Sequence, residues 1–134
     1  MLAHHALSLA DAKTMADAAR GEAERNKWSV VIAIVDDGGH LLYLERMDGT
    51  QKASCLVAQE KAKSAILFKR PTLALEKVVA DGRIAMTTLP GATMVEGGLP
   101  IVFRDCFVGA IGVSGVQSSQ DGIIAKAGLD ALPV

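Results

Sequence analysis

The sequence has few aromatic residues and almost no net charge. Only 4% of its 134 residues are aromatic although 50% are hydrophobic, so we expect an aliphatic core in which helices pack close to a sheet. The formal net charge of -1 excludes the strong positive field on which non-specific nucleic-acid binding depends. The longest apolar run, Val30 to Val35, is much shorter than the roughly 20 residues needed to cross a bilayer.

The N-terminus and the cysteines indicate a cytoplasmic protein. Residues 1–5 lack the basic and long apolar segments of a signal peptide. Cys55 and Cys106 are far apart and form no CxxC pair, and such cysteines are more often reduced than joined in a disulfide. With 134 residues the chain has the usual size of one domain, so we expect a single domain over residues 1–134.

Hydrophobic periodicity predicts an α+β fold. Ser8 with Asp11 forms a capping pair before the first helical stripe, and period-2 or continuous apolar runs mark the strands. The predicted elements are helix 9–26, strands 30–35 and 40–46, helix 53–69, helix 73–80, an irregular segment 83–99, strands 100–104 and 107–114, and helix 118–131. Two hairpins with amphipathic helices are best accommodated by an antiparallel sheet covered by helices.

Two further features concern the helices. Ser118 with Asp121 predicts a second capping pair, at the start of the last helix. The sequence has one cluster of basic residues, which comprises Lys61, Lys63, Lys69 and Arg70. We expect it on the solvated face of the second long helix, with attraction of an anionic ligand as the alternative.

His40 closes the motif of residues 36–40, Asp-Asp-Gly-Gly-His. A hairpin turn explains the motif, because glycines accept positive φ and aspartates cap the turn. The alternative is that His40, at the start of a strand, is a ligand or a proton carrier.

Arg46, Met47 and Asp48 follow the end of the next strand, where binding groups tend to occur. Arg46 can hold a carboxylate through a bidentate pair. The alternative is a simple turn at Asp48 with Arg46 in solvent.

A glycine-rich segment precedes the third strand. Glycines allow the backbone to approach a ligand or a neighbouring chain, and Glu96 beside Gly97 and Gly98 can act as an acid, a base or an acceptor. No dinucleotide-binding or P-loop motif occurs.

His4 and His5 are adjacent near the N-terminus, where disorder is common. They can ligate iron only if another chain or the first helix fixes them. With 3 histidines and no His/Cys cluster at ligand spacing, we expect no metal site built from protein side chains alone.

Several segments, in order, carry a family resemblance. They are residues 31–41 (VIAIVDDGGHL), 46–50 (RMDGT), 61–65 (KAKSA), 70–72 (RPT), 97–101 (GGLPI), 108–115 (VGAIGVSG), 120–121 (QD) and 124–128 (IAKAG). Together they resemble the GlcG-like family, also called haem-degrading or DUF336 proteins. The family is similar to the C-terminal domain of the diol-utilisation corrinoid adenosyltransferase.

The resemblance implies a profilin-like fold, with a five-stranded antiparallel sheet and helices on both faces. It also implies homo-oligomers, as dimers or larger assemblies, and a small-molecule or haem ligand. Several members bind haem or are linked to its breakdown, and the related corrinoid-enzyme domain takes haem through a histidine.

Three functions follow from these observations. The first is haem binding, with or without haem degradation. Its candidate iron ligands are His40, His4, His5 or the weaker Met47 and Met94, with Arg46 on the propionates. The second is an acid/base enzyme for a small oxygenated metabolite; its catalytic residues are His40, Glu96 and Asp48, and its substrate-binding residues are Arg46, Gly97 and Gly98. The third is a non-catalytic oligomeric domain for sensing or assembly. Whether the chain is an enzyme stays open.

Overall fold

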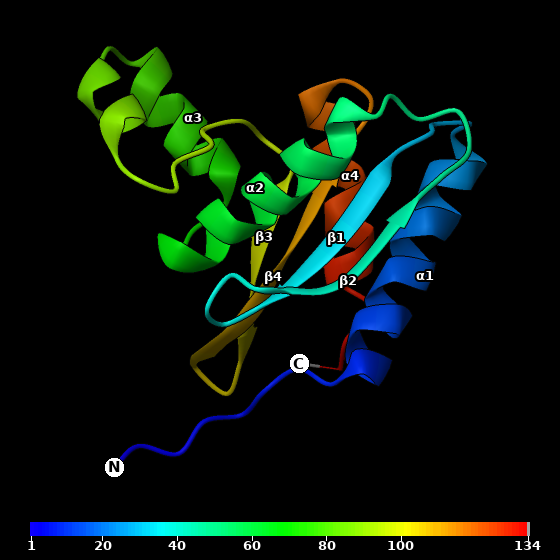
Figure 1. The fold of residues 1–134 in the computed structure, drawn as a ribbon, viewed down its shortest axis with the longest axis horizontal. Coiled ribbons are helices and arrows are strands. Elements are labelled where there is room, and N and C mark those ends of the chain that lie inside the picture. The colour runs from blue at the N-terminus through cyan, green and yellow to red at the C-terminus, as the bar shows by residue number, and fades with distance from the viewer. Residues whose placement is uncertain (134) are drawn as a thin grey trace.

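The computed structural model describes residues 1–133 and confirms the predicted order of elements (Figure 1). The elements are α1 (Leu9–Arg25), β1 (Val31–Asp36), β2 (Leu41–Arg46), α2 (Ala53–Leu67), α3 (Thr72–Ala80), the 3-10 helix η1 (Ile84–Thr88), β3 (Gly98–Phe103), β4 (Cys106–Ser114) and α4 (Ser118–Leu129). None of the helices within residues 1–133 combines the length and the apolar character that a membrane span requires.

The strands form one sheet in the order β2-β1-β4-β3, and every neighbouring pair is antiparallel. This confirms the α+β class and the two hairpins. Within residues 1–133 the sheet has 4 strands, so the fifth strand implied by the family resemblance is not found. The two predicted hairpins account for the whole sheet.

Helices cover both faces of the sheet, as predicted. A Cβ added at Gly112 of β4 would lie 2.1 Å from the Ala58 carbonyl oxygen of α2, whereas Ile111 contacts the position of Gly128 in α4. Consecutive strand residues face opposite sides of a sheet. Therefore α2 lies on one face and α4, which packs beside α1, on the other (Figure 1).

Of the two predicted helix caps, the one at α1 is confirmed and the one at α4 is wrong. At α1 the Ser8 side chain accepts from the Asp11 N–H at 3.0 Å, and the Asp11 carboxylate accepts from the Ser8 N–H at 2.9 Å. At α4 the predicted Ser118–Asp121 pair is wrong. The N-cap is Gln117, whose N–H donates to the side chain of Gln120, because the Asp121 carboxylate is turned toward α2 instead.

Candidate functional site

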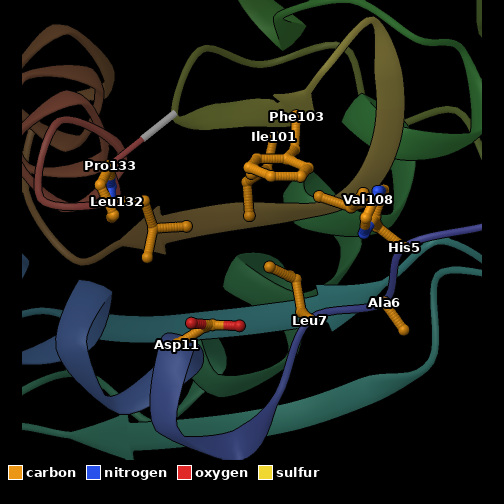
Figure 2. Close-up of a pocket in the computed structure, with 9 residues that line it drawn as sticks. All are labelled: His5, Ala6, Leu7, Asp11, Ile101, Phe103, Val108, Leu132 and Pro133. Atoms are coloured by element: carbon orange, nitrogen blue, oxygen red, sulfur yellow. The ribbon is translucent and has the colours of Figure 1, made fainter.

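An apolar pocket lies between the N-terminal segment and the face of the sheet that carries α1 and α4 (Figure 2). Its volume is about 260 Å³, and it is lined by His5, Ala6, Leu7, Asp11, Ile101, Phe103, Val108, Leu132 and Pro133. Most of these side chains are apolar. His5 and Asp11 are the two that titrate, and Asp11 is already engaged in the cap of α1.

Leu7 fixes the N-terminal segment on the sheet. A Cβ at Gly109 would lie 2.6 Å from the Leu7 Cδ1 atom and 2.3 Å from the Val35 carbonyl oxygen. The missing side chain at position 109 therefore leaves the space that Leu7 fills. Helix α1 begins directly after its N-cap, Ser8. Residues 5–7 precede this cap and lie along the pocket.

A β-bulge brings Val108 to the pocket wall. Ile101 pairs with Gly109, but the next residue of β3, Val102, pairs with Phe107. Val108 is therefore the extra residue of β4. Bulges redirect side chains near functional sites, and here the bulge puts the buried Val108 beside Ile101 and Phe103.

His5 lies at the mouth of this pocket. Its ring centroid is 4.9 Å from that of Phe103, with the planes at 78°, an edge-to-face contact of the kind that aromatic rings favour. His5 is exposed, so its imidazole is accessible to a ligand that enters the pocket. His4, the adjacent histidine, does not line the pocket.

His40 belongs to the β1–β2 turn. This turn packs against α2, on the face of the sheet opposite the pocket. The Asp36 carboxylate accepts from the N–H groups of Gly38 and His40, both at 2.9 Å, which confirms that the motif builds a hairpin turn. A Cβ at Gly39 would lie 3.0 Å from the Lys63 Cγ atom of α2. His40 is exposed on this turn and does not line the pocket of His5.

Arg46, Met47 and Asp48 lie at the other end of the sheet. Arg46 pairs with Val31, which pairs with Ser114 at the end of β4. The pocket is at the start of β4, and nine extended residues separate the two ends by about 26 Å at about 3.3 Å per residue. Arg46 therefore cannot share one ligand with His5. Met47 packs against the core, and Asp48 is exposed.

The glycine segment is covered by α2. A Cβ at Gly97 would lie 2.8 Å from the Lys61 Nζ atom, and a Cβ at Gly98 would lie 2.3 Å from the Lys61 carbonyl oxygen. Both glycines are buried. They allow close packing of α2 on the sheet, and their expected contact with a substrate stays a prediction.

The predicted acid/base group does not form one site. Glu96 precedes β3 and its carboxylate lies against Gly122 of α4, whereas Asp48 follows β2. The strands β2 and β3 are the two edges of the sheet, about 14 Å apart at about 4.8 Å per strand. His40 lies at the far end of β2, so the three side chains do not converge.

Lys61 and Asp121 form a buried ion pair that the sequence analysis missed. The Lys61 side chain is 2% exposed and the Asp121 side chain 3%, and Lys61 Nζ donates to Asp121 Oδ2 and to the Val113 carbonyl oxygen, both at 3.0 Å. Burial raises the pKa of the Asp121 carboxyl, and the bond from Lys61 opposes that shift.

The expected place of Lys61 on a solvated helix face is wrong. It shares the buried stripe of Ala58 and Ala65, which is the signal that identifies it.

No group of three His, Cys, Asp or Glu side chains suited to a metal ion is found in the part of the chain that the structure describes. Cys55 and Cys106 are free thiols. A metal-containing ligand held by this chain would therefore have to bring most of its own coordination.

Comparison with known proteins places the chain in a family. The model of the haem-degrading HbpS-like proteins matches residues 7–130, so His4 and His5 precede the matched region. Protein GlcG of Escherichia coli K12 is 45% identical over 108 residues, which are 81% of each chain. Among solved structures, this chain is similar to an HbpS double mutant from Streptomyces reticuli, with a TM-score of 0.93 and 31% sequence identity. The superposition covers 100% of this chain and 92% of the HbpS chain. The structure of a PduOC–haem complex has a TM-score of 0.89 at 28% identity, covering 97% of both chains. The resemblance seen in the sequence is thus confirmed, and the chain belongs to the HbpS-like family of haem-degrading proteins, which includes GlcG.

Proposed function

We propose that this protein binds haem at the apolar pocket of His5, where the His5 imidazole would hold the iron. The observation that carries the proposal is the accessible imidazole at the mouth of an apolar pocket, fixed there by Phe103. The description of the family and the haem bound to the related PduOC support it.

The residues of the pocket fit the chemistry of haem. A haem site needs a donor for the iron and an apolar surface for the macrocycle, and His5 with Ile101, Val108 and Leu132 supplies both. The volume of about 260 Å³ is just below the range of about 300–1,000 Å³ for ligand cavities. The pocket would therefore hold only part of the macrocycle.

Each part of the site has a separate task in this proposal. Leu7, held above Gly109, positions the segment that carries His5. Phe103 orients the imidazole through the edge-to-face contact of the two rings. Bound haem supplies a redox-active iron centre, while the chain's own residues bind and orient the macrocycle and keep water from its buried edge.

Haemin titration of matched histidine variants tests the proposal. We expect the Soret band of the wild-type protein to shift in a saturable way, and His5→Ala to weaken binding at least about tenfold, because loss of even a supporting residue at a metal site costs 10–100-fold. His4→Ala and His40→Ala are the matched controls. Both remove an exposed histidine outside the pocket, and both are expected to bind like wild type.

Two results would contradict haem binding at His5. One is a weak shift without saturation that is the same in all four proteins. The other is a loss of binding in His40→Ala with His5→Ala unaffected, which would move the ligand to the β1–β2 turn.

Self-association and a cytoplasmic location stay predictions. The segment formed by α3 and η1 extends away from the sheet (Figure 1), and η1 contributes no buried residue. Ile84 in this segment is 70% exposed. Leu89, just after η1, is a second exposed apolar side chain of this segment. We expect a second subunit to cover both, in keeping with the proposed homo-oligomer.

A further inference from the structure

The turn between β3 and β4 holds an arginine in an unfavourable backbone conformation. Arg104 and Asp105 have φ of 47° and 63°, and they link Phe103 to Cys106, which pair across the hairpin. Two-residue turns with positive φ at both positions favour Asn-Gly or Asp-Gly. Left-handed backbone is unfavourable for an ordinary L-residue, because its Cβ lies too close to the following carbonyl oxygen. Such a residue at the rim of a pocket points to a role for its side chain.

The Arg104 side chain lies over the ring that orients His5. Its guanidinium carbon is 5.1 Å from the centroid of the Phe103 ring, within the range of a cation–π contact. The same ring makes the edge-to-face contact with His5 and lines the pocket. One phenyl ring thus holds a cation and an imidazole together.

The guanidinium is available for a ligand. Arg104 is exposed and takes part in none of the ion pairs formed within residues 1–133. An arginine fork binds a carboxylate through two parallel hydrogen bonds. The guanidinium lies over the Phe103 ring, which lines the pocket, and is therefore next to any ligand that extends beyond the pocket on that side.

We propose that Arg104 is the residue that recognises the carboxylates of the ligand, binding a propionate of the haem whose iron His5 holds. This assignment rests on the proposed haem site and replaces Arg46, which lies at the other end of the sheet. Lys69 offers a contrast. It is also a cation over a phenyl ring, 5.5 Å from the centroid of Phe107, but Phe107 packs with the residues of α2 on the opposite face.

The experiment compares the affinity for haemin with that for haemin dimethyl ester, in which both propionates are esterified. The difference reports recognition of the carboxylates, and the affinity for the ester reports binding of the macrocycle. We expect the wild-type protein to bind haemin about tenfold more tightly than the ester, because esterification removes the charge-assisted hydrogen bonds between the guanidinium and a carboxylate. In Arg104→Asn the ratio should fall to about one, with the affinity for the ester unchanged. Asparagine tolerates the left-handed conformation, so this variant should melt no lower than wild type.

The control is Lys69→Gln, which is expected to keep the wild-type ratio. The proposal is overturned if the wild-type protein does not distinguish haemin from its ester, if Arg104→Asn keeps the preference, or if Lys69→Gln loses it. Failure of the haem site itself has a different signature, namely that His5→Ala binds both compounds as the wild-type protein does.

Discussion

Gly112→Ala is expected to abolish cooperative folding of the chain. The added Cβ would lie 2.1 Å from the Ala58 carbonyl oxygen and 2.6 Å from the Ala62 nitrogen. Both atoms are backbone atoms of α2, so no side-chain rotation relieves the clash. Gly112 also lies in a central strand, paired with Ala33 on one side and Gly98 on the other, so it cannot move without breaking the sheet.

Urea unfolding followed by circular dichroism measures this effect, with Gly21→Ala as the matched control. A Cβ at Gly21 meets only the flexible Arg25 side chain at 3.4 Å. Replacing a glycine within a helix by alanine stabilises by roughly 0.5–1 kcal/mol, so the control should unfold at a higher urea concentration than wild type. A Gly112→Ala protein with a wild-type midpoint would contradict the close contact between α2 and β4.

Lys61→Met is expected to lower the free energy of unfolding by about 3–5 kcal/mol, the usual cost of removing one partner of a buried ion pair. The reason is that Asp121 is left buried without its cation. The double variant Lys61→Met/Asp121→Leu removes the uncompensated charge and should regain at least half of the loss. Full recovery is not expected, because the Val116 N–H also loses its acceptor on Asp121.

The pH dependence of the Lys61→Met variant gives an independent check. Burial already raises the pKa of Asp121 in the folded chain, and removal of Lys61 removes the group that opposes the shift. The folded variant then binds a proton at a pH at which the unfolded chain does not. Its stability should therefore rise as the pH falls from 7 toward the ordinary carboxyl pKa of about 3.9. A variant as stable as wild type at pH 7, with no such rise, would show that the pair contributes little.

The order of helices and strands could be predicted from the sequence because it depends on local periodicity. The burial of Lys61 has one local signal, its place on the buried stripe of Ala58 and Ala65. Its partner could not be predicted, because Asp121 lies 60 residues along the chain. The same partner explains why the expected cap at Ser118 is wrong. The Asp121 carboxylate accepts from the Lys61 ammonium group and from the Val116 N–H, so it does not cap Ser118.

Only part of the candidate site could be predicted from the sequence. His40 and Arg46 are near each other in sequence, but the strand between them carries them to opposite ends of the sheet. His5 has no motif around it. Its position follows from contacts with residues about 100 positions away, Phe103 through its ring and Gly109 through Leu7, which no local pattern reveals. The bulge at Val108 is likewise a property of strand pairing.

Paramagnetic broadening in the amide NMR spectrum measures where the haem iron lies. With substoichiometric haemin, we expect the signals of Leu7, Ile101, Phe103 and Val108 to broaden first, because these residues surround the mouth of the pocket. Zinc protoporphyrin, which is diamagnetic, should shift the same signals without broadening them. Broadening centred on Arg46 to Asp48, or spread evenly over the surface, would contradict haem binding at His5.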